Sequence, residues 1–269
     1  MNLLEALLYG AVQGITEYLP VSSSAHLILV PKFLKTPDPG LSFDVFLHLG
    51  TLCSTLLFFR EDWAMVFRQA FHPPGKGEQN LFLLIVIGTI PALIAGALIH
   101  KQAETIFRGN QVLMITLAVG GILLFGVDFW REHVTPVGRP ITQAGIKDAI
   151  WVGISQCFAL VPGMSRSGST MIGGRLMGLD RAAAARFSFL LSAPITAAAL
   201  VFELRKYREL LESNVGVPAM IVGGLSSFAF GFLAIGALLK LLKRFGYLSF
   251  AIYRVALSVV IYRVLGTDG

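Results

Sequence analysis

The chain has 269 residues, of which 55% are hydrophobic and 14% charged, and its mean hydropathy is +0.71. Soluble domains carry about 25% charged residues, so this composition excludes an ordinary soluble fold. Long continuous apolar runs, unlike the short alternating segments of a transmembrane β-barrel, predict an all-α polytopic membrane protein. The net charge is +6, but the basic residues lie mostly between apolar runs, so nucleic acid is not an expected partner.

The chain opens with an apolar segment, residues 3–19, that has the length of a helix but carries polar side chains. Gln13 and Glu17 are four residues apart, so they project from one face of that helix. A helix surrounded by lipid would not keep a glutamate on its surface, because an unpaired carboxylate in hydrocarbon is costly. We therefore expect this face to lie against protein. A signal peptide is not expected, because Glu5 interrupts the apolar residues and a basic start is missing.

The sequence PVSSSAH at residues 20–26 ends the first helix and begins a second one. Proline breaks the first helix, and Ser22 or Ser23 can cap the next, which is predicted to run through His26 to about residue 30. Neither helix provides a full span of roughly 20 residues without carrying polar groups to mid-depth. The pair is therefore predicted to form a re-entrant hairpin, whose irregular tip must be buried by protein.

Six apolar segments are predicted to cross the membrane as helices, at about 43–59, 81–99, 111–127, 184–202, 217–239 and 248–265. Residues 60–80 are predicted to form a polar loop. Arg254 and Arg263 are expected near the two ends of the last span, where their side chains can reach the interface. Cys53 and Cys157 lie inside apolar runs and are predicted to be small buried residues.

The sequence PGMSRSGST at residues 162–170 interrupts the second half of the chain in the same style as PVSSSAH. It follows a helix predicted at 149–161 and precedes a second short helix that ends near residue 179. A proline and a glycine break the apolar pattern, and hydroxyl side chains follow at once. This arrangement predicts a second re-entrant hairpin.

We predict a single membrane domain, 1–269, built from two repeats at about 1–128 and 144–266. Each repeat contains one hairpin and three spans, which is an odd number of crossings, so the second copy must be inverted. Aligning Pro20 with Pro162 relates the two hairpins. In inverted repeats with broken helices, the binding site lies where the breaks meet. The two motifs are therefore expected to come together in space.

Positive charges in the loops predict the orientation of the chain. The loops on the side of residues 60–80 hold 12 Lys and Arg, and those on the opposite side hold 8. The side richer in positive charge is expected to face the cytoplasm. Both termini and the opening of the first hairpin are then predicted to lie on the outer side.

The two motifs collect polar groups that an apolar bundle has no structural reason to contain. Arg166 at membrane depth costs roughly 2.5–3.5 kcal/mol on insertion scales, so it is expected to bind an anion. Hydroxyls and helix N-termini add donors, while Glu17 and His26 can move a proton, a set that suits phosphoryl transfer. Ser23 lies three residues before His26 and could be a nucleophile activated by it, or His26 could attack directly. The spacing leaves both alternatives open.

Structural explanations compete with this interpretation. A serine after a proline is most often a helix cap, which accounts for Ser22, and a lone histidine is often a satisfied core residue. His48 lies in the first full span near Asp44, and the sequence favours neither a core role nor a site role for it. A carrier would also place broken helices and Arg166 at a repeat interface, so a transporter or flippase of an anion or anionic lipid is the alternative function.

The run QGITEYLPVSSSAH, the run PGMSRSGST and the segment FAIYR at 250–254 together resemble the undecaprenyl-diphosphate phosphatase family of the bacitracin-resistance type. The similarity spans nearly the whole chain. The resemblance implies an integral membrane enzyme of bacterial envelopes that hydrolyses undecaprenyl diphosphate to the monophosphate. Such an enzyme recycles the lipid carrier for cell-wall synthesis and confers resistance to bacitracin.

The resemblance also implies roles for individual residues. Glu17 and Gln13 match the acidic motif (Glu/Gln)xxxGlu, which would hold a divalent cation, Mg²⁺ or Ca²⁺; because Gln13 is the amide variant, this chain has one carboxylate there. Ser23, His26 and Glu17 are the predicted catalytic residues. The predicted ligands of the substrate phosphates are Arg166, Ser165, Ser167, Thr170 and Ser22.

The resemblance also implies which partners the protein has and where in the cell it is located. The expected partners are a polyprenyl diphosphate lipid and membrane lipids, and a homodimer is left open. The expected location is the bacterial plasma (inner) membrane, crossed several times, with the active site opening to the outer, periplasmic side.

Overall fold

A computed structural model describes residues 1–267 of the chain except 76, 106, 108, 136–137 and 204–214. The described residues form helices joined by turns, with no strand among them, which confirms the predicted all-α class. The helices in chain order are α1 (Leu3–Tyr18), α2 (Ser23–Leu34), α3 (Leu41–Phe58), α4 (Arg60–Phe71), α5 (Leu81–Thr105), α6 (Asn110–His133), α7 (Ile146–Cys157), α8 (Arg166–Leu176), α9 (Arg181–Glu203), α11 (Val217–Leu242) and α12 (Leu248–Leu265).

Five of these helices, α5, α6, α9, α11 and α12, are long and apolar enough to cross a membrane. Helices α3 and α4 qualify together as a sixth span that is bent by 82° between them. The chain is therefore a multi-pass membrane protein, as predicted. Large apolar side chains are exposed along these helices, among them Leu98, Leu225 and Leu233, and lipid would cover them.

The prediction of a polar loop at 60–80 is wrong for its first part, where α4 forms. Glu61 and Asp62 lie in the first turn of α4, where carboxylates stabilise a helix N-terminus. Val66 is buried, and Asp62 accepts a hydrogen bond of 2.6 Å from Arg186 of α9. The helix was missed because charged residues, among them Arg60, Glu61 and Arg68, interrupt its apolar residues.

The two predicted hairpins are present as the pairs α1–α2 and α7–α8. Ser22 and Ser165 cap α2 and α8, and both have positive φ, 74° and 71°. Each cap hydroxyl accepts a hydrogen bond from the amide three residues later, Ala25 in one hairpin and Gly168 in the other. These caps correct the sequence alignment by one residue, because Ser22, and not Ser23, is the counterpart of Ser165.

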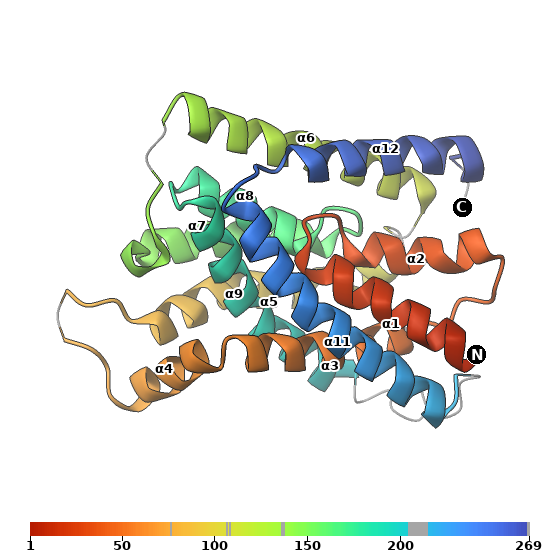
Figure 1. Cartoon of the computed structure of the whole chain (residues 1–269), viewed down its shortest axis with the longest axis horizontal. Helices are drawn as coiled ribbons and strands as arrows, with labels where there is room; N and C mark the ends of the chain where they lie inside the picture. The colour runs from red at the N-terminus through yellow and green to blue at the C-terminus, as the bar shows by residue number, and fades with distance from the viewer. Residues whose placement is uncertain (76, 106, 108, 136–137, 204–214, 268–269) are drawn as a thin grey trace.

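The first helix of each hairpin packs on a long span from the other half of the chain. Helix α1 packs on α11, which lies beside it in Figure 1, and α7 packs on α5. A side chain at Gly10 would collide with the Gly223 carbonyl, and one at Gly153 with the Gly88 carbonyl. This exchange between halves supports the inverted repeat. The boundaries 1–128 and 144–266 stay a prediction.

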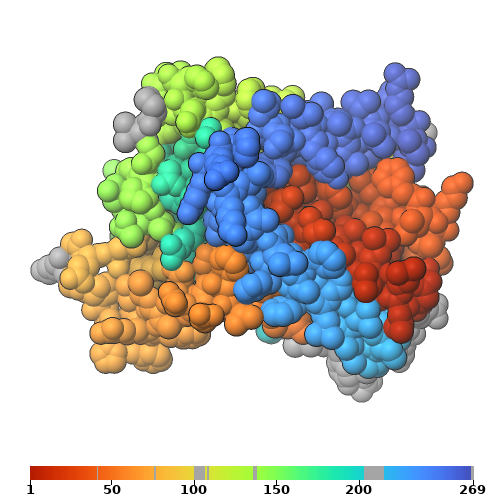
Figure 2. Space-filling view, in the orientation of Figure 1, coloured from red at the N-terminus to blue at the C-terminus, as the bar shows by residue number. Residues whose placement is uncertain are grey.

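Helices α6 and α12 lie side by side along one edge of the molecule (Figures 1 and 2). Gly120 and Gly121 provide the close approach, because Gly121 lies against the backbone of Ala251 and Gly120 against the Arg254 side chain. Both chain termini lie at the right-hand end of Figure 1, while the connection from α4 to α5 lies at the left. This arrangement is the one expected if each repeat crosses the membrane an odd number of times.

The cysteine prediction is wrong for Cys53, whose side chain is exposed on the surface of α3, and Cys157 is only partly buried. Both are free thiols. An apolar run does not distinguish the face of a helix that contacts lipid from the face that contacts protein. In a membrane protein both faces are apolar, so the direction of the Cys53 side chain could not be predicted from the apolar run.

The prediction that Arg254 reaches the interface is also wrong, because its side chain is 0% exposed. Its guanidinium donates to the carbonyl of Pro20 in the first break and to those of Gly163 and Met164 in the second. It also donates to the carbonyls of Thr116 and Leu117 in α6. Breaking a helix leaves carbonyls without amide partners, and Arg254 supplies donors to carbonyls of both breaks at once.

Replacing Arg254 should damage both stability and the joint between the hairpins. We expect Arg254→Ala to lower the free energy of unfolding by about 3 kcal/mol, because several buried carbonyls lose their donor. Arg254→Lys should recover part of that loss. Unfolding in detergent micelles measures both. Arg263→Ala on the same helix is the control, since Arg263 is exposed. Equal stability of the Arg254 and Arg263 variants would contradict this role.

Candidate active site

The tips of the two hairpins lie against each other, as the sequence predicts. Arg166, the first residue of α8, donates a hydrogen bond of 2.7 Å from Nη2 to Glu17 Oε1 near the end of α1. Ser167 Oγ donates to the carbonyl of Leu19 at 3.0 Å. A charged contact and a neutral contact thus join the second break to the first. The residues they join lie almost 150 positions apart: 149 for the first contact and 148 for the second.

Glu17 is the centre of the cluster, and its side chain is only 6% exposed. Its Oε1 accepts from Arg166, while Oε2 accepts from Ser23 Oγ at 2.6 Å and from Gln13 Nε2 at 3.0 Å. A buried carboxylate is stable only when charge and donors surround it. In this short contact the Ser23 hydroxyl donates its proton as a hydrogen bond to a carboxylate oxygen. This is the geometry of a base beside a nucleophile.

His48 on α3 is the site residue that the sequence left undecided. Its Nε2 lies 3.5 Å from Glu17 Oε2, and its Nδ1 lies 2.7 Å from the carbonyl oxygen of Asp44. Because a carbonyl oxygen only accepts, Nδ1 carries a proton and Nε2 is the atom left to face Glu17. His48 can therefore balance the charge of Glu17 when protonated. Its position in an apolar span near Asp44 was the only available signal.

His26 lies on α2, as Ser23 does, and contacts Tyr253 of α12. Its Nδ1 donates to the carbonyl of Ser22 at 2.7 Å, so Nε2 accepts from the hydroxyl of Tyr253, also at 2.7 Å. The two rings are stacked with their centroids 5.7 Å apart. Within the described residues, the ring nitrogens of His26 bond to these partners and not to Ser23. Tyr253 was missed because it lies 227 residues away in a lipid-facing helix.

The predicted phosphate ligands divide into an accessible residue and a buried group. Arg166 retains 15% exposure of its side chain, and the candidate catalytic residues Ser23 and His26 are also partly exposed. The hydroxyls of the buried group bond to protein, as caps at Ser22 and Ser165 and through contacts of Ser167 to Leu19 and of Thr170 to the Arg166 carbonyl. These four residues shape the breaks; their role as phosphate ligands stays a prediction.

The predicted divalent cation site at Gln13 and Glu17 has few donor atoms from the protein. The described residues contain no group of three or more His, Cys, Asp and Glu side chains placed to hold a metal ion. Gln13 and Glu17 offer one amide oxygen and one carboxylate, and Gln13 Oε1 is buried without a hydrogen-bond partner. Mg²⁺ often takes one carboxylate and several water and phosphate oxygens. The donors therefore fit a cation that is held mainly by a phosphorylated substrate.

Comparison with known proteins relates nearly the whole chain to one family. The family model described as "Bacitracin resistance protein BacA" matches residues 6–260. A protein of Moorella thermoacetica named undecaprenyl-diphosphatase is 44% identical to it, with 98% of each chain covered. Proteins of the same name from Gemmatimonas aurantiaca and Idiomarina loihiensis are 41% and 40% identical, covering 99% and 97% of this chain and 99% and 98% of theirs. The protein therefore belongs to the BacA family of bacitracin resistance proteins.

Proposed function

We propose that this protein hydrolyses undecaprenyl diphosphate to undecaprenyl phosphate and inorganic phosphate. The observation that carries the proposal is Glu17, which receives the Ser23 hydroxyl on one oxygen and Arg166 on the other. The names of the relatives support the same substrate. The reaction would recycle the lipid carrier for peptidoglycan synthesis and would confer bacitracin resistance by removing the diphosphate form.

In the first step Ser23 Oγ attacks the terminal phosphorus. An Oγ–P bond forms, the bond from that phosphorus to the bridging oxygen breaks, and undecaprenyl phosphate leaves with the electron pair. The Ser23 proton passes to Glu17 Oε2, 2.6 Å away in the structure. His48 beside Glu17 balances the charge of the carboxylate before and after this transfer.

In the second step water attacks the phosphoserine. His26 is placed to accept the proton of that water at Nε2 once Tyr253 turns its hydroxyl away, because Nδ1 is already protonated. The Oγ–P bond breaks, and Ser23 recovers its proton from Glu17. The alternative, direct attack by His26 Nε2, needs the same displacement of Tyr253 and has no carboxylate beside it among the described residues.

Arg166 binds the transferred phosphoryl group in this proposal. When the diphosphate arrives, the guanidinium exchanges its bond to Glu17 for phosphate oxygens. The Glu17 carboxylate is then free of the guanidinium, and its Oε2 stays in contact with the Ser23 hydroxyl. The amide groups at the first turns of α2 and α8, which begin at Ser23 and Arg166, add donors for the anion.

The proposed location is the bacterial plasma membrane, with the site open to the outer side and the prenyl tail between helices. Phosphate released by right-side-out vesicles should appear outside them. A flippase that only carries the lipid would need Arg166 but no serine hydroxyl on a buried carboxylate. Phosphate release by purified protein in detergent separates these functions, since a carrier produces none.

The identity of the nucleophile can be read from a trapped phosphoprotein. Wild-type protein, quenched during turnover of a diphosphate labelled at its terminal phosphate, should carry an acid-stable label. Ser23→Ala should abolish the label, while His26→Ala should retain it because water activation is lost. Ser24→Ala, at the exposed neighbouring hydroxyl, is the control and should label normally. An acid-labile label that survives in Ser23→Ala would assign the attack to His26.

Arg166→Ala should lower kcat/KM by about 10³-fold, because the phosphoryl charge loses its guanidinium partner. The variant also leaves Glu17 buried without a cation, which is destabilising in its own right. The double variant Arg166→Ala/Glu17→Gln should therefore be more stable than the single one and remain inactive. Near-normal phosphate release by a folded Arg166→Ala protein would refute the assigned role.

We propose that Mg²⁺ or Ca²⁺ binds with the diphosphate, with Gln13 and Glu17 as its protein ligands, and neutralises phosphate charge. Chelation should then stop turnover without unfolding the protein. Gln13→Glu should lower the cation concentration needed for half-maximal activity, because a second carboxylate is added. Gln13→Ala should raise it. Full activity in excess chelator would show that no divalent cation takes part.

A further inference from the structure

The hydroxyl of Tyr253 occupies the basic nitrogen of His26. Nδ1 of His26 donates to the Ser22 carbonyl at 2.7 Å, and this bond fixes both the orientation of the ring and its tautomer. Nε2 is therefore the ring atom that can take a proton, and it accepts a hydrogen bond of 2.7 Å from Tyr253. The second step of the proposed reaction needs the same nitrogen for a water molecule. The Tyr253 hydroxyl and that water compete for it.

The contact also has a stabilising role when no substrate is bound. The two rings are nearly parallel, at 5°, with their centroids 5.7 Å apart. A ring nitrogen without a hydrogen-bond partner beside an apolar helix is unfavourable. Tyr253 supplies that partner to His26 in the resting protein.

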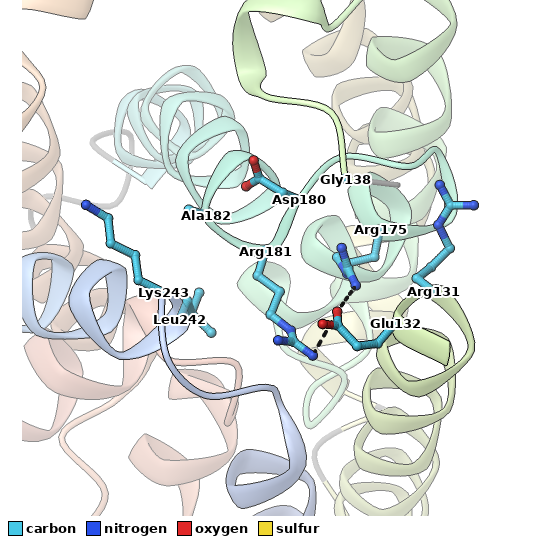
Figure 3. Close-up of a pocket in the computed structure, with 9 residues that line it drawn as sticks. All are labelled: Arg131, Glu132, Gly138, Arg175, Asp180, Arg181, Ala182, Leu242 and Lys243. Atoms are coloured by element: carbon cyan, nitrogen blue, oxygen red, sulfur yellow. Dashed lines mark hydrogen bonds and ion pairs between the residues drawn. The ribbon is translucent and has the colours of Figure 1, made fainter. Parts of the chain in front are cut away.

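Helix α12 is anchored where it begins. The amide of Tyr247, just before α12, donates to Asp128 Oδ2 at 3.3 Å. Asp128 Oδ1 accepts from Arg175 at 3.0 Å and from Arg181 at 2.9 Å. Those two guanidinium groups converge on Glu132 in a cavity of about 470 Å³ (Figure 3). The start of α12 is thus tied to α6, α8 and α9.

The residue that follows Tyr253 is anchored as well. Arg254 is fully buried and donates to the carbonyl of Pro20, in the break that precedes α2. The part of α12 that carries Tyr253 and the start of the helix that carries His26 are therefore held in one frame. Because the backbone is fixed, the Tyr253 hydroxyl leaves His26 by rotation of its own side chain.

That rotation has room on the lipid side of α12. Tyr253 is 44% exposed, and Ile252 and Val255 near it on the helix are exposed too. Rotamer changes of exposed side chains are fast, on the scale of picoseconds to nanoseconds. In lipid the hydroxyl would lose its hydrogen-bond partner, so the bonded position is favoured at rest and the rotated position is a minor state.

We propose that Tyr253 is a positioning residue that controls the second step of the reaction, because its hydroxyl must leave His26 Nε2 before water can bind there. This inference rests on the proposed function. The first step does not involve the contact, since Glu17 takes the Ser23 proton. Tyr253 therefore lengthens the lifetime of the phosphoserine and leaves its formation unchanged.

The lifetime of the phosphoserine tests this role. Protein labelled by a diphosphate that carries the label at its terminal phosphate is chased with unlabelled substrate, and the label on Ser23 is followed. Tyr253→Phe keeps the ring and removes the hydroxyl, so the label should decay about two- to tenfold faster, because one hydrogen bond no longer competes with water. In a His26→Ala background, Tyr253→Phe should change nothing. Tyr262→Phe, at an exposed tyrosine of the same helix, is the control and should match the wild type.

Chemical modification of His26 tests the resting contact without turnover. Diethyl pyrocarbonate acylates an unprotonated imidazole nitrogen, here Nε2, and mass spectrometry of the His26 peptide measures the rate. Tyr253→Phe should be modified about two- to tenfold faster than the wild type, because the hydroxyl no longer covers Nε2. Tyr262→Phe should react at the wild-type rate.

The outcomes separate this inference from the proposed function. Equal modification rates in Tyr253→Phe and wild type would overturn the resting contact. Faster modification with an unchanged or slower decay of the phosphoserine would leave Tyr253 a structural partner of His26 and overturn its control of the second step. If the wild type releases no phosphate and carries no label, the proposed hydrolysis fails, and the control of its second step fails with it, whatever the modification rates show of the contact.

Discussion

A helix that breaks at membrane depth leaves backbone groups without partners, and this fold depends on supplying them. Ser22 and Ser165 satisfy amides on the outgoing helices, while Arg254 satisfies carbonyls from both breaks. The Arg254 side chain therefore holds the two breaks together through their carbonyls. The ion pair between Glu17 and Arg166 forms within that frame, so its geometry does not depend on the pair's own strength.

Ser22 and Ser165 cap their helices in the same way, but the residues that follow them differ in their chemistry. When Ser22 is superposed on Ser165, Ser23 corresponds to Arg166, and each is the first residue of its helix. One half of the structure thus presents a hydroxyl beside a carboxylate, and the other half presents a cation. Neither motif has both a nucleophile with its base and a phosphate-binding charge. The site therefore needs both hairpins.

The sequence predicted the helical class, both hairpins and their meeting, because prolines and charges inside apolar runs are strong local signals. It did not predict which side chains bond across the structure. Arg254 contacts a carbonyl 234 residues away, and Tyr253 contacts His26 from a distance of 227 residues. The exposed Cys53 and the helix α4 were missed for a related reason. In lipid, hydrophobicity does not mark the buried face, so direction is decided by tertiary packing alone.

Helix α8 carries an arginine near each end, and the two arginines have different roles. Its first residue, Arg166, is paired with a carboxylate that the substrate can replace, because Glu17 has other donors in Gln13, Ser23 and His48. Near its other end, Arg175 is fixed by Asp128 and the Leu179 carbonyl and is almost fully buried. One arginine is thus exchangeable and the other anchors the helix. A short helix fixed at one end can present a charge at the other without moving, which is the preorganisation that phosphoryl transfer requires.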